Sequence, residues 1–373
     1  MPSTPVSRPR PAITRCCMRS GRRLPTATPM SVPSRTVPTL MKVPVSNGRG
    51  EWQAVAPDVL IVSLGTTAGL RTADDALEGS LQHAGASVAV ARVPVPARLP
   101  PTLAAQDLLL ARAAREVVTD ARAVVYSSTT AALLWPRPGA IRFDALSAAN
   151  RPGRHGVWQR PVERRRLEAS PLLLPWSAGA LAEGPSVASP ALVVPVPVTP
   201  GAAASGPRDL AAVTYGTNPG KKGLDRVLGA WALARREGET LVVLGGPRVD
   251  APGVRWQPLA SAADWRALLR RARVYVTAPR REDYGLAQLE ALAEGCQLVT
   301  NAAPGPYAAL PLARLLDARL VGDDLARALR VALDDSRPDY AERAADALRP
   351  WHPDAVDALV AERVLPALLG EVG

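Results

Sequence analysis

The segment from Val274 to Thr300 reads VYVTAPRREDYGLAQLEALAEGCQLVT, and it decides the fold class. Val274–Thr277 and Gln297–Thr300 are short apolar runs typical of buried strands, and Leu286–Glu294 between them has helical spacing. Strand, loop, helix and strand in this order predict a βαβ unit, in which the two strands lie parallel in one sheet.

The same alternation extends through the second half of the chain. Further strands and helices are expected at Ala211–Tyr215, Gly223–Arg236, Thr240–Leu244, Val254–Gln257, Ala262–Arg271 and Asp324–Asp334. Such alternation predicts an α/β lobe with a parallel sheet covered by helices on both faces. Ligands of these sheets bind at the carboxyl ends of the strands.

The first half has its own alternating region. It opens with a strand at Asp58–Leu64, a glycine-containing turn, a helix from Thr72 to about Ala84 and a strand at Ala86–Val93. Further elements are expected as strands at Ala123–Ser128 and Gly139–Asp144 and as a basic helix at Arg160–Ala169, and the apolar run Ala191–Val198 closes the lobe. The sequence therefore predicts a second Rossmann-like lobe.

These patterns divide the chain into five parts. We expect a basic, disordered tail at 1–50, a first lobe at 57–198, a linker at 199–209 and a second lobe at 210–350. The last part, 351–373, holds a helix that can pack back on the first lobe.

The formal net charge of +11 comes mainly from the tail. Residues 1–50 hold nine basic residues and no acidic one, which leaves 36 basic and 34 acidic residues in the rest of the chain. Three origins of the tail stay open: a mis-assigned start codon, a transit-like segment and a basic arm for anionic surfaces. Because the body is nearly neutral, we expect no nucleic-acid partner.

Other function classes are disfavoured by composition. Cys296 is the only cysteine after residue 50, and no histidine has a cysteine or another histidine at metal-ligand spacing, so neither a disulfide scaffold nor a structural zinc site is expected. No apolar run is long enough to span a bilayer, and the N-terminus has no apolar core of a secretory signal. We therefore expect a cytoplasmic protein.

Candidate binding chemistry is concentrated where the helix of the opening segment begins. A glycine at this place, Gly285, lets a ligand approach the backbone, and the free N–H groups of a helix start suit an anion. Glu282 precedes it in the loop and Glu290 follows within the helix. Carboxylates accept hydrogen bonds from the paired hydroxyls of sugars, so the arrangement predicts a sugar-nucleotide pocket. Taken singly, each glutamate is more typical of a solvated helix surface.

The segment resembles the E-x7-E signature of retaining glycosyltransferase family four, which has the GT-B fold of two Rossmann-like lobes facing across a cleft. The matching positions are Glu282, Tyr284, Gly285, Leu286, Glu290, Ala291 and Gly295. The resemblance implies that Glu290 binds the ribose hydroxyls, that Glu282 approaches the donor sugar and that backbone amides near Gly285 and Leu286 contact the diphosphate. It also places Tyr284 at the donor site.

A second motif, YGTNPGKKGLD, follows the strand at Ala211–Tyr215. Lysines near a helix start are disfavoured by the helix dipole, so Lys221 and Lys222 indicate an anion nearby. In the family, a Gly-Arg pair ends this strand and a Lys-Gly pair follows; Lys222 and Gly223 match the latter, whereas Thr217 stands where the arginine belongs. The resemblance implies that Lys222 stabilises the leaving diphosphate, with Lys221 and Thr217 beside the donor.

The first lobe adds less specific candidates. Gly65, Thr66 and Arg71 lie in the loop that the GT-B resemblance places under the donor diphosphate, and Arg71 or Lys221 is a replacement for the missing arginine on grounds of reach. The resemblance puts Asp144 on the acceptor side, although a turn or N-cap aspartate explains it equally well. Tyr307 either stacks on the nucleotide base or belongs to the core.

The implied reaction moves a sugar, with retention, from a nucleoside diphosphate sugar to a hydroxyl of a glycan, lipid or small molecule. No separate cofactor is expected, and the absence of an Asp-x-Asp motif in a suitable loop favours a metal-independent site. An arginine-rich stretch from Arg151 to Arg166 is either a peripheral contact with anionic acceptors or membranes, or a solvated helix face.

The sequence can be compared with three other functions. A nicotinamide or flavin oxidoreductase would need a dinucleotide fingerprint, which this chain lacks. The only feature that favours nucleic-acid binding is the basic tail. A catalytically inactive GT-B binding or scaffolding protein is the stronger alternative, because the phosphate arginine is missing.

Overall fold

The computed structural model describes residues 44–46, 52–54, 56–96, 98–151, 153–201, 206–259 and 261–371. β1 (Pro44–Ser46) and β2 (Trp52–Ala54) form a two-stranded antiparallel sheet. β1 is a strand inside the stretch expected to have no regular structure. The remainder of the basic tail lies outside the described residues, so its predicted disorder stays a prediction.

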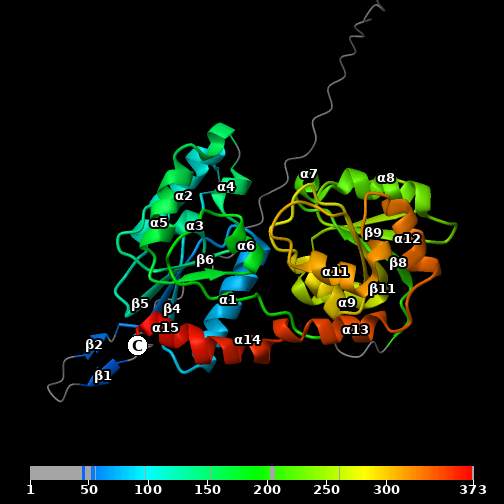
Figure 1. Cartoon of the computed structure of the whole chain (residues 1–373). Helices are drawn as coiled ribbons and strands as arrows, with labels where there is room; N and C mark the ends of the chain where they lie inside the picture. Colours follow the sequence, from blue (N-terminus) through cyan, green and yellow to red (C-terminus); the bar gives the residue numbers. More distant parts are fainter. Residues whose placement is uncertain are drawn as a thin grey trace, which may run out of the picture. The chain divides into compact units, whose positions relative to one another are not determined.

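The first lobe contains a five-stranded, fully parallel sheet in the order β4-β3-β5-β6-β7 (Figure 1). Its strands are β3 (Val59–Ser63), β4 (Val88–Arg92), β5 (Ala123–Tyr126), β6 (Ala140–Phe143) and β7 (Leu173–Pro175). Its helices are α1 (Ala68–His83), α2 (Leu103–Glu116), α3 (Thr129–Ala132), α4 (Ser147–Asn150), the 3-10 turn η1 (Gly153–Gly156), α5 (Gln159–Ala169) and α6 (Ala178–Ala182).

The alternation of side chains along these strands divides the core of the first lobe in two. Leu60 and Val62 of β3 pack with residues of α2, α3, α5 and α6 on one face. Val59 and Ile61 pack with residues of α1 on the other. This second face also receives valines from the C-terminal end of the chain, so the sheet is covered on both sides.

The run Ala191–Val198 that closes the lobe is bridged to β7 at Ala191 and Leu173, and its prolines at 195 and 197 have no N–H to donate to a longer ladder. One expectation for the first lobe was wrong. The first helix begins at Ala68 rather than near Thr72, since the hydroxyl of Thr67 accepts a hydrogen bond from Leu70 N at 3.2 Å and caps it. Arg71 therefore lies within the first turn of a helix.

The second lobe contains another five-stranded parallel sheet, in the order β10-β9-β8-β11-β12. Its strands are β8 (Leu210–Tyr215), β9 (Leu241–Leu244), β10 (Val254–Gln257), β11 (Ala272–Thr277) and β12 (Gln297–Thr300). All five were predicted to within two residues at each end. The order reverses between β8 and β11, and such a switch point is where sheets of this kind bind ligands.

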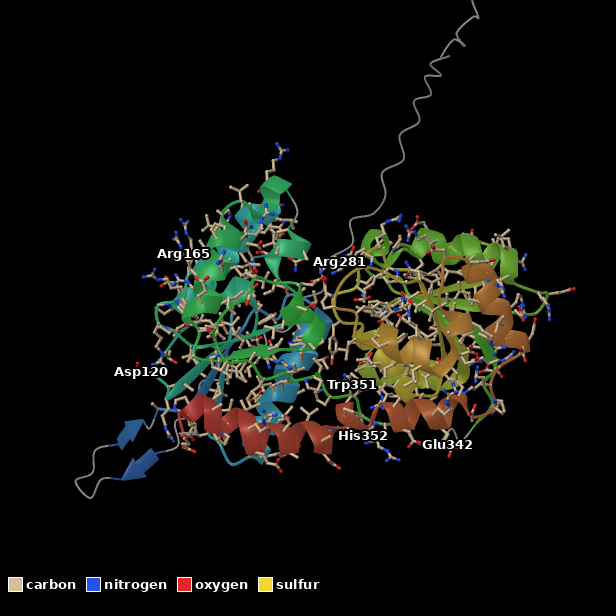
Figure 2. All side chains as sticks on the ribbon, viewed as in Figure 1. Asp120, Arg165, Arg281, Glu342, Trp351 and His352 are labelled. Atoms are coloured by element: carbon tan, nitrogen blue, oxygen red, sulfur yellow. The ribbon has the colours of Figure 1, made fainter. Side chains whose placement is uncertain are left out.

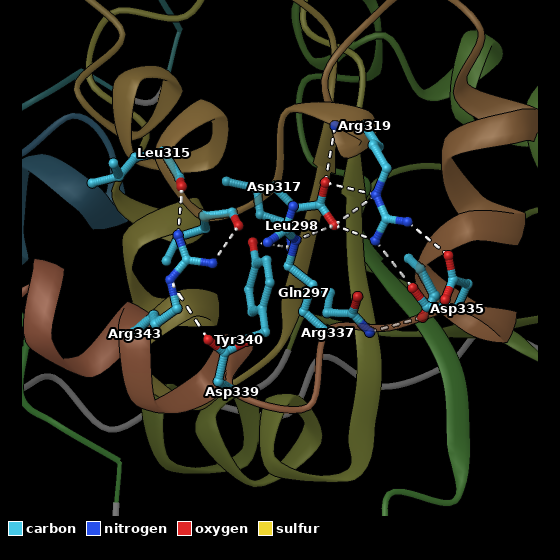
Figure 3. Close-up of polar contacts among 12 residues, drawn as sticks. Gln297, Leu298, Leu315, Asp317, Arg319, Asp335, Arg337, Asp339, Tyr340 and Arg343 are labelled. Carbon is cyan, nitrogen blue, oxygen red and sulfur yellow. Dashed lines mark hydrogen bonds and ion pairs between the residues drawn. The ribbon is translucent and has the colours of Figure 1, made fainter.

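The helices of the second lobe follow the strands. They are α7 (Pro219–Lys222), α8 (Leu224–Ala234), α9 (Ala262–Arg271), α10 (Leu286–Ala293), α11 (Ala309–Asp317), the 3-10 turn η2 (Ala318–Leu320), α12 (Leu325–Asp334) and α13 (Tyr340–Ala347). Figure 3 shows how α13 is fixed to the sheet: the hydroxyl of Tyr340 accepts a hydrogen bond from Leu298 N of β12 at 3.1 Å. Asp317 and Arg319 form an ion pair in the same region.

The chain ends on the first lobe. A 3-10 turn η3 (Arg349–Trp351) leads into α14 (Pro353–Leu359), the π-helical turn η4 (Val360–Val364) and α15 (Leu365–Leu369). Val356, Val360 and Val364 are buried in the cluster that contains Val59 and Ile61 of β3. Full burial of a valine contributes about 1.5–2 kcal/mol, so these three side chains fix the C-terminal helix to the first lobe.

Gly223 brings the loops that follow β8 and β11 into backbone contact. Its φ is +64°, and a Cβ atom at this position would lie 1.9 Å from the carbonyl oxygen of Ala278. Only glycine satisfies both constraints. Gly220, three residues earlier, is subject to neither constraint: a Cβ there would meet nothing within 4 Å, and its φ is not positive.

We expect Gly223→Ala to lower the free energy of unfolding by about 2–4 kcal/mol, because it adds backbone strain and a clash. Gly220→Ala should change it by less than about 1 kcal/mol. Urea unfolding of both variants measures the difference, and equal effects would contradict this account of the contact.

Candidate active site

Two loops meet at the switch point of the second sheet. Residues 216–223 follow β8 and contain α7, and residues 278–285 follow β11 and lead into α10. Besides the contact at Gly223, Arg280 N donates a hydrogen bond to Lys221 O at 2.9 Å. The two predicted motifs are therefore brought together by backbone interactions, and their charged side chains face one another.

Lys222 and Glu282 form a close ion pair. The ammonium of Lys222 donates to both carboxylate oxygens of Glu282, at 2.9 and 2.7 Å. Gln288 of α10 donates a further hydrogen bond to Oε2 of Glu282 at 2.9 Å. Glu282 is buried, so its charge depends on these partners, since an unpaired buried carboxylate is costly.

Lys221 forms a second ion pair beside the first. Its partner is Asp283, which is also buried. The other oxygen of Asp283 accepts a hydrogen bond from Arg281 Nε at 2.9 Å, and Arg281 Nη2 reaches Glu183 of the first lobe at 2.5 Å. Two cations thus share one carboxylate, and the chain of contacts continues into the first lobe.

The start of α10 lies beside these pairs. Its first N–H groups have no partner within the helix, which makes the helix end suited to an anion. Gly285 caps it with a φ of +93°, and a Cβ there would lie 2.8 Å from the ring of Tyr307. Glycine is therefore required here by its backbone conformation and by the packing of Tyr307, and the close approach of a ligand stays a prediction.

The side chain of Glu290 lies further along α10. Its Oε2 accepts a hydrogen bond from Trp265 Nε1 at 2.8 Å, and burial raises the pKa of the carboxyl group. Trp265 packs against Tyr215 and Tyr275, with ring centroids 5.9 and 6.0 Å away. The indole of Trp265, itself packed against two tyrosine rings, therefore holds the Glu290 carboxylate from one side.

Tyr284 contacts the chain segments that connect the two lobes. Its hydroxyl accepts hydrogen bonds from Val196 N and from Trp351 Nε1, each at 3.0 Å, and its ring packs against Trp176. It is buried, so only its backbone is left to contact a ligand. Tyr307 is a core residue: it is buried, and its hydroxyl lies 2.9 Å from Thr300 Oγ1.

Asp144 follows β6 and is half-buried. Burial, and then the negative charge of Asp283, raise the pKa of Asp144 to about 6, while the positive charge of Lys221 opposes this shift. Asp283 and Lys221, whose charges act on Asp144, both belong to the charged loops of the second lobe. Asp144 is not an N-cap residue, because the next helix, α4, starts at Ser147 and has Leu146 at its N-cap.

Comparisons with known proteins bear on the fold. No family model and no curated protein sequence matches the chain. Solved structures do match: WaaG, a glycosyltransferase involved in lipopolysaccharide biosynthesis, has a TM-score of 0.59 at 16% identity, over 84% of this chain and 99% of that one. HepE from Anabaena in complex with UDP and glucose has 0.58 at 12%, over 82% and 98%. Sucrose-phosphate synthase from Thermosynechococcus elongatus has 0.57 at 17%, over 81% and 96%.

The chain has the GT-B fold. Two parallel five-stranded sheets, each flanked by helices, agree with these structures and with the predicted fold class. The identities are low, so the likeness concerns the fold, and the roles of individual residues must be argued from the site itself.

Contacts between the GT-B lobes place the first-lobe candidates. A Cβ on Gly69, in the first turn of α1, would lie 3.9 Å from Leu286 Cδ2 at the start of α10. Gly65 and Thr66 come just before Thr67, the N-cap of α1, and their contact with a donor stays a prediction. Arg71 folds back within its own lobe, where Nη1 donates to Gly65 O at 2.7 Å. Thr217 is exposed beside Gly245.

The basic stretch of the first lobe is largely engaged in structural contacts. Arg151 pairs with Asp107 at 2.8 Å, Arg164 with Glu168 at 2.8 Å, and Arg166 lies over the ring of Trp135. Within the described residues, no helix has the length and apolar character to cross a bilayer, and no group of three or more metal-ligand side chains is assembled. The peripheral membrane contact stays a prediction.

Sequence reasoning missed four side chains that contact the predicted ones. They are Gln288, Asp283, Trp265 and Arg281. Asp283 and Gln288 lie inside the recognised motif, so their types were visible but their directions were not. Trp265 is 25 positions from Glu290 in the sequence, and no local pattern connects the two.

The pKa of Asp144 has a consequence for stability. A carboxyl group with a native pKa of about 6, above its ordinary value of 3.8, resists ionisation in the folded state. Its contribution to stability is therefore lost as the pH rises from about 4 to about 6. Asp144→Asn removes this ionisation. We therefore expect the substitution to be more stabilising at about pH 8 than at about pH 4, by about 1–3 kcal/mol in the free energy of unfolding.

Urea unfolding of the wild type and of Asp144→Asn at both pH values tests this. Comparing the two pH values removes any change in packing that is common to both. A difference between the proteins that does not depend on pH would contradict the environment described for Asp144.

Proposed function

We propose that the protein is a retaining glycosyltransferase that moves a sugar from a nucleoside diphosphate sugar to a hydroxyl acceptor. The observation that carries this proposal is the contact of Lys222 with Glu282 at the start of α10, with Glu290 on the same helix. This arrangement brings a cation, a helix end and two carboxylates together at the switch point of a GT-B lobe. The HepE structure, with UDP and glucose, supports a sugar nucleotide as the donor.

The diphosphate of the donor would lie over the start of α10. The unpaired N–H groups there, Lys221 and Lys222 all favour negative charge. Both lysines are paired with carboxylates in the free protein, so a diphosphate exchanges one set of ionic partners for another. The lysines are thus held in place before the ligand binds, which reduces the entropy lost on binding.

Glu290 would bind the ribose. One of its oxygens accepts from Trp265, and the two oxygens together offer enough lone pairs to accept from sugar hydroxyls as well. Trp265 fixes the direction of the carboxylate. Glu282, bonded to Lys222 and Gln288, would lie where the sugar joins the diphosphate and would contact the sugar hydroxyls.

The chemistry would proceed on one face of the sugar. The bond from the anomeric carbon to the diphosphate oxygen breaks, and the acceptor oxygen forms a bond on the same face while its proton passes to the leaving phosphate. Lys221, Lys222 and the helix end stabilise the charge that develops on this phosphate. Asp144, near Asp283 and Lys221, is on the first-lobe side, where it would orient the acceptor hydroxyl.

We expect UDP, GDP or ADP to raise the melting temperature of a shortened chain that begins near Glu51, because a ligand that binds only the native state stabilises it. The gain is about 2.7 kcal/mol at a concentration of about 100 times Kd. Lys222→Ala and Glu290→Ala should each weaken binding about tenfold or more, since each removes a charged hydrogen-bonding group.

Glu237→Ala is the matched control, because Glu237 is exposed and outside the site. It should bind like the wild type. If no nucleotide stabilises the wild type, the proposed donor site is wrong, and a GT-B protein without sugar-nucleotide activity becomes the better description.

Retention is tested separately by following the slow hydrolysis of UDP-glucose by NMR, with the hydroxyl of water as acceptor. The sugar first released should be the α-anomer, before it equilibrates in solution. Initial release of the β-anomer would overturn the same-face mechanism and leave the donor site intact.

A further inference from the structure

The start of α10 is surrounded by three cations, and each is paired with a carboxylate. Lys222 pairs with Glu282, Lys221 with Asp283, and Arg281 with both Asp283 and Glu183. An anion that binds here must compete with these carboxylates. The cation whose pairing is weakest is therefore the one most available to it.

The pairs differ in how strongly water screens them. The side chain of Glu282 is 5% exposed and that of Asp283 is 10% exposed, whereas Glu183 is 21% exposed. An ion pair gains less from mutual attraction as its exposure rises. Glu282 is also fixed by Gln288. Among the cations Lys221 is the most exposed, at 38% against 21% for Arg281, but Glu183 is the carboxylate that water solvates best once its cation is withdrawn.

Arg281, labelled in Figure 2, also has the donors that a phosphate group needs. Its Nε is bonded to the same carboxylate as the Lys221 ammonium, so the two cations are neighbours. Within the described part of the chain, its Nη1 makes no hydrogen bond, and release from Glu183 frees Nη2 as well. Two parallel N–H donors are what a bidentate phosphate contact requires.

We infer that Arg281 is a donor-phosphate ligand and that Glu183 occupies it while the site is empty. This inference rests on the proposed function, and it adds a phosphate-binding residue to it. When the diphosphate binds, its oxygens replace the Glu183 carboxylate on Arg281, while Asp283 keeps the guanidinium beside Lys221. The lobe-to-lobe ion pair is exchanged for a contact with the ligand.

A purely structural role for the same ion pair makes a different prediction. If Arg281 only connects the two lobes, then removing either Arg281 or Glu183 breaks the same contact and affects nucleotide binding alike. If Arg281 binds phosphate, the two changes have opposite signs, because loss of Glu183 removes a competitor for the guanidinium.

The experiment is calorimetric titration with UDP, GDP and ADP, each beside its nucleoside, on the wild type and on Arg281→Gln, Glu183→Gln and Arg280→Gln. We expect Arg281→Gln to weaken diphosphate binding about tenfold or more and to leave nucleoside binding unchanged. Glu183→Gln should bind the diphosphate at least as tightly as the wild type. Arg280→Gln removes a neighbouring charge that pairs with exposed Asp225, so it should stay within about twofold.

Equal losses in Arg281→Gln and Glu183→Gln, or wild-type affinity in Arg281→Gln, would overturn the inference while the donor site stands. A loss in Arg280→Gln as large as in Arg281→Gln would also overturn it, since the effect would then reflect net charge alone. If the wild type binds none of the three diphosphates, the proposed function fails and the inference fails with it. Melting curves of the unliganded variants confirm that each is folded.

Discussion

The close approach of two loop backbones at Gly223 is the constraint on which the candidate site depends. Because Gly223 has no side chain, its backbone packs directly on the carbonyl of Ala278, and the loop after β8 lies against the loop after β11. The two loops leave the sheet at the strands between which its order reverses. Lys221 and Lys222 then face Asp283 and Glu282 without further adjustment. A side chain at 223 would separate the cations from the carboxylates.

A second glycine fixes the carboxylate loop from the other side. At Gly305, where φ is +117°, a Cβ would lie 2.2 Å from the carbonyl oxygen of Glu282, and Glu282 N donates to Pro304 O at 3.0 Å. The backbone of Glu282 is therefore enclosed between two loops. Its carboxylate has little freedom, which suits a group that must be placed accurately in a reaction.

The electrostatics of the site follow from burial. Carboxylates that are removed from water need cations or hydrogen-bond donors, and here the partners are the side chains that an anionic ligand would also use. The free protein thus carries its own substitute for the ligand charge. Asp144 shows the cost of this arrangement, since its pKa rises to about 6 in an environment where burial and Asp283 disfavour its ionised form.

The elements of the second lobe could be predicted from the sequence because their signals are local. Apolar runs, helical spacing and glycines mark β8 to β12 to within two residues. The sequence assigned Lys222 and Glu282 to the same donor site, but it did not indicate that the two side chains pair with each other. The contact of Arg281 with Glu183 joins residues 98 positions apart on different lobes, and no pattern in either segment indicates it.

Tyr284 shows why a matched motif does not by itself assign a side chain. It has the position and the aromatic character that the resemblance requires, yet its hydroxyl accepts hydrogen bonds from Val196 in the segment that leaves the first lobe and from Trp351 in the segment that returns to it. Val198 N also donates to Trp351 O at 2.8 Å, so these two crossings are bonded to each other. One residue of the predicted donor loop is thus attached to both chain segments that connect the lobes. A tyrosine at this place therefore has a structural role that is independent of any ligand. A relative movement of the lobes that separates the two crossings must break these hydrogen bonds.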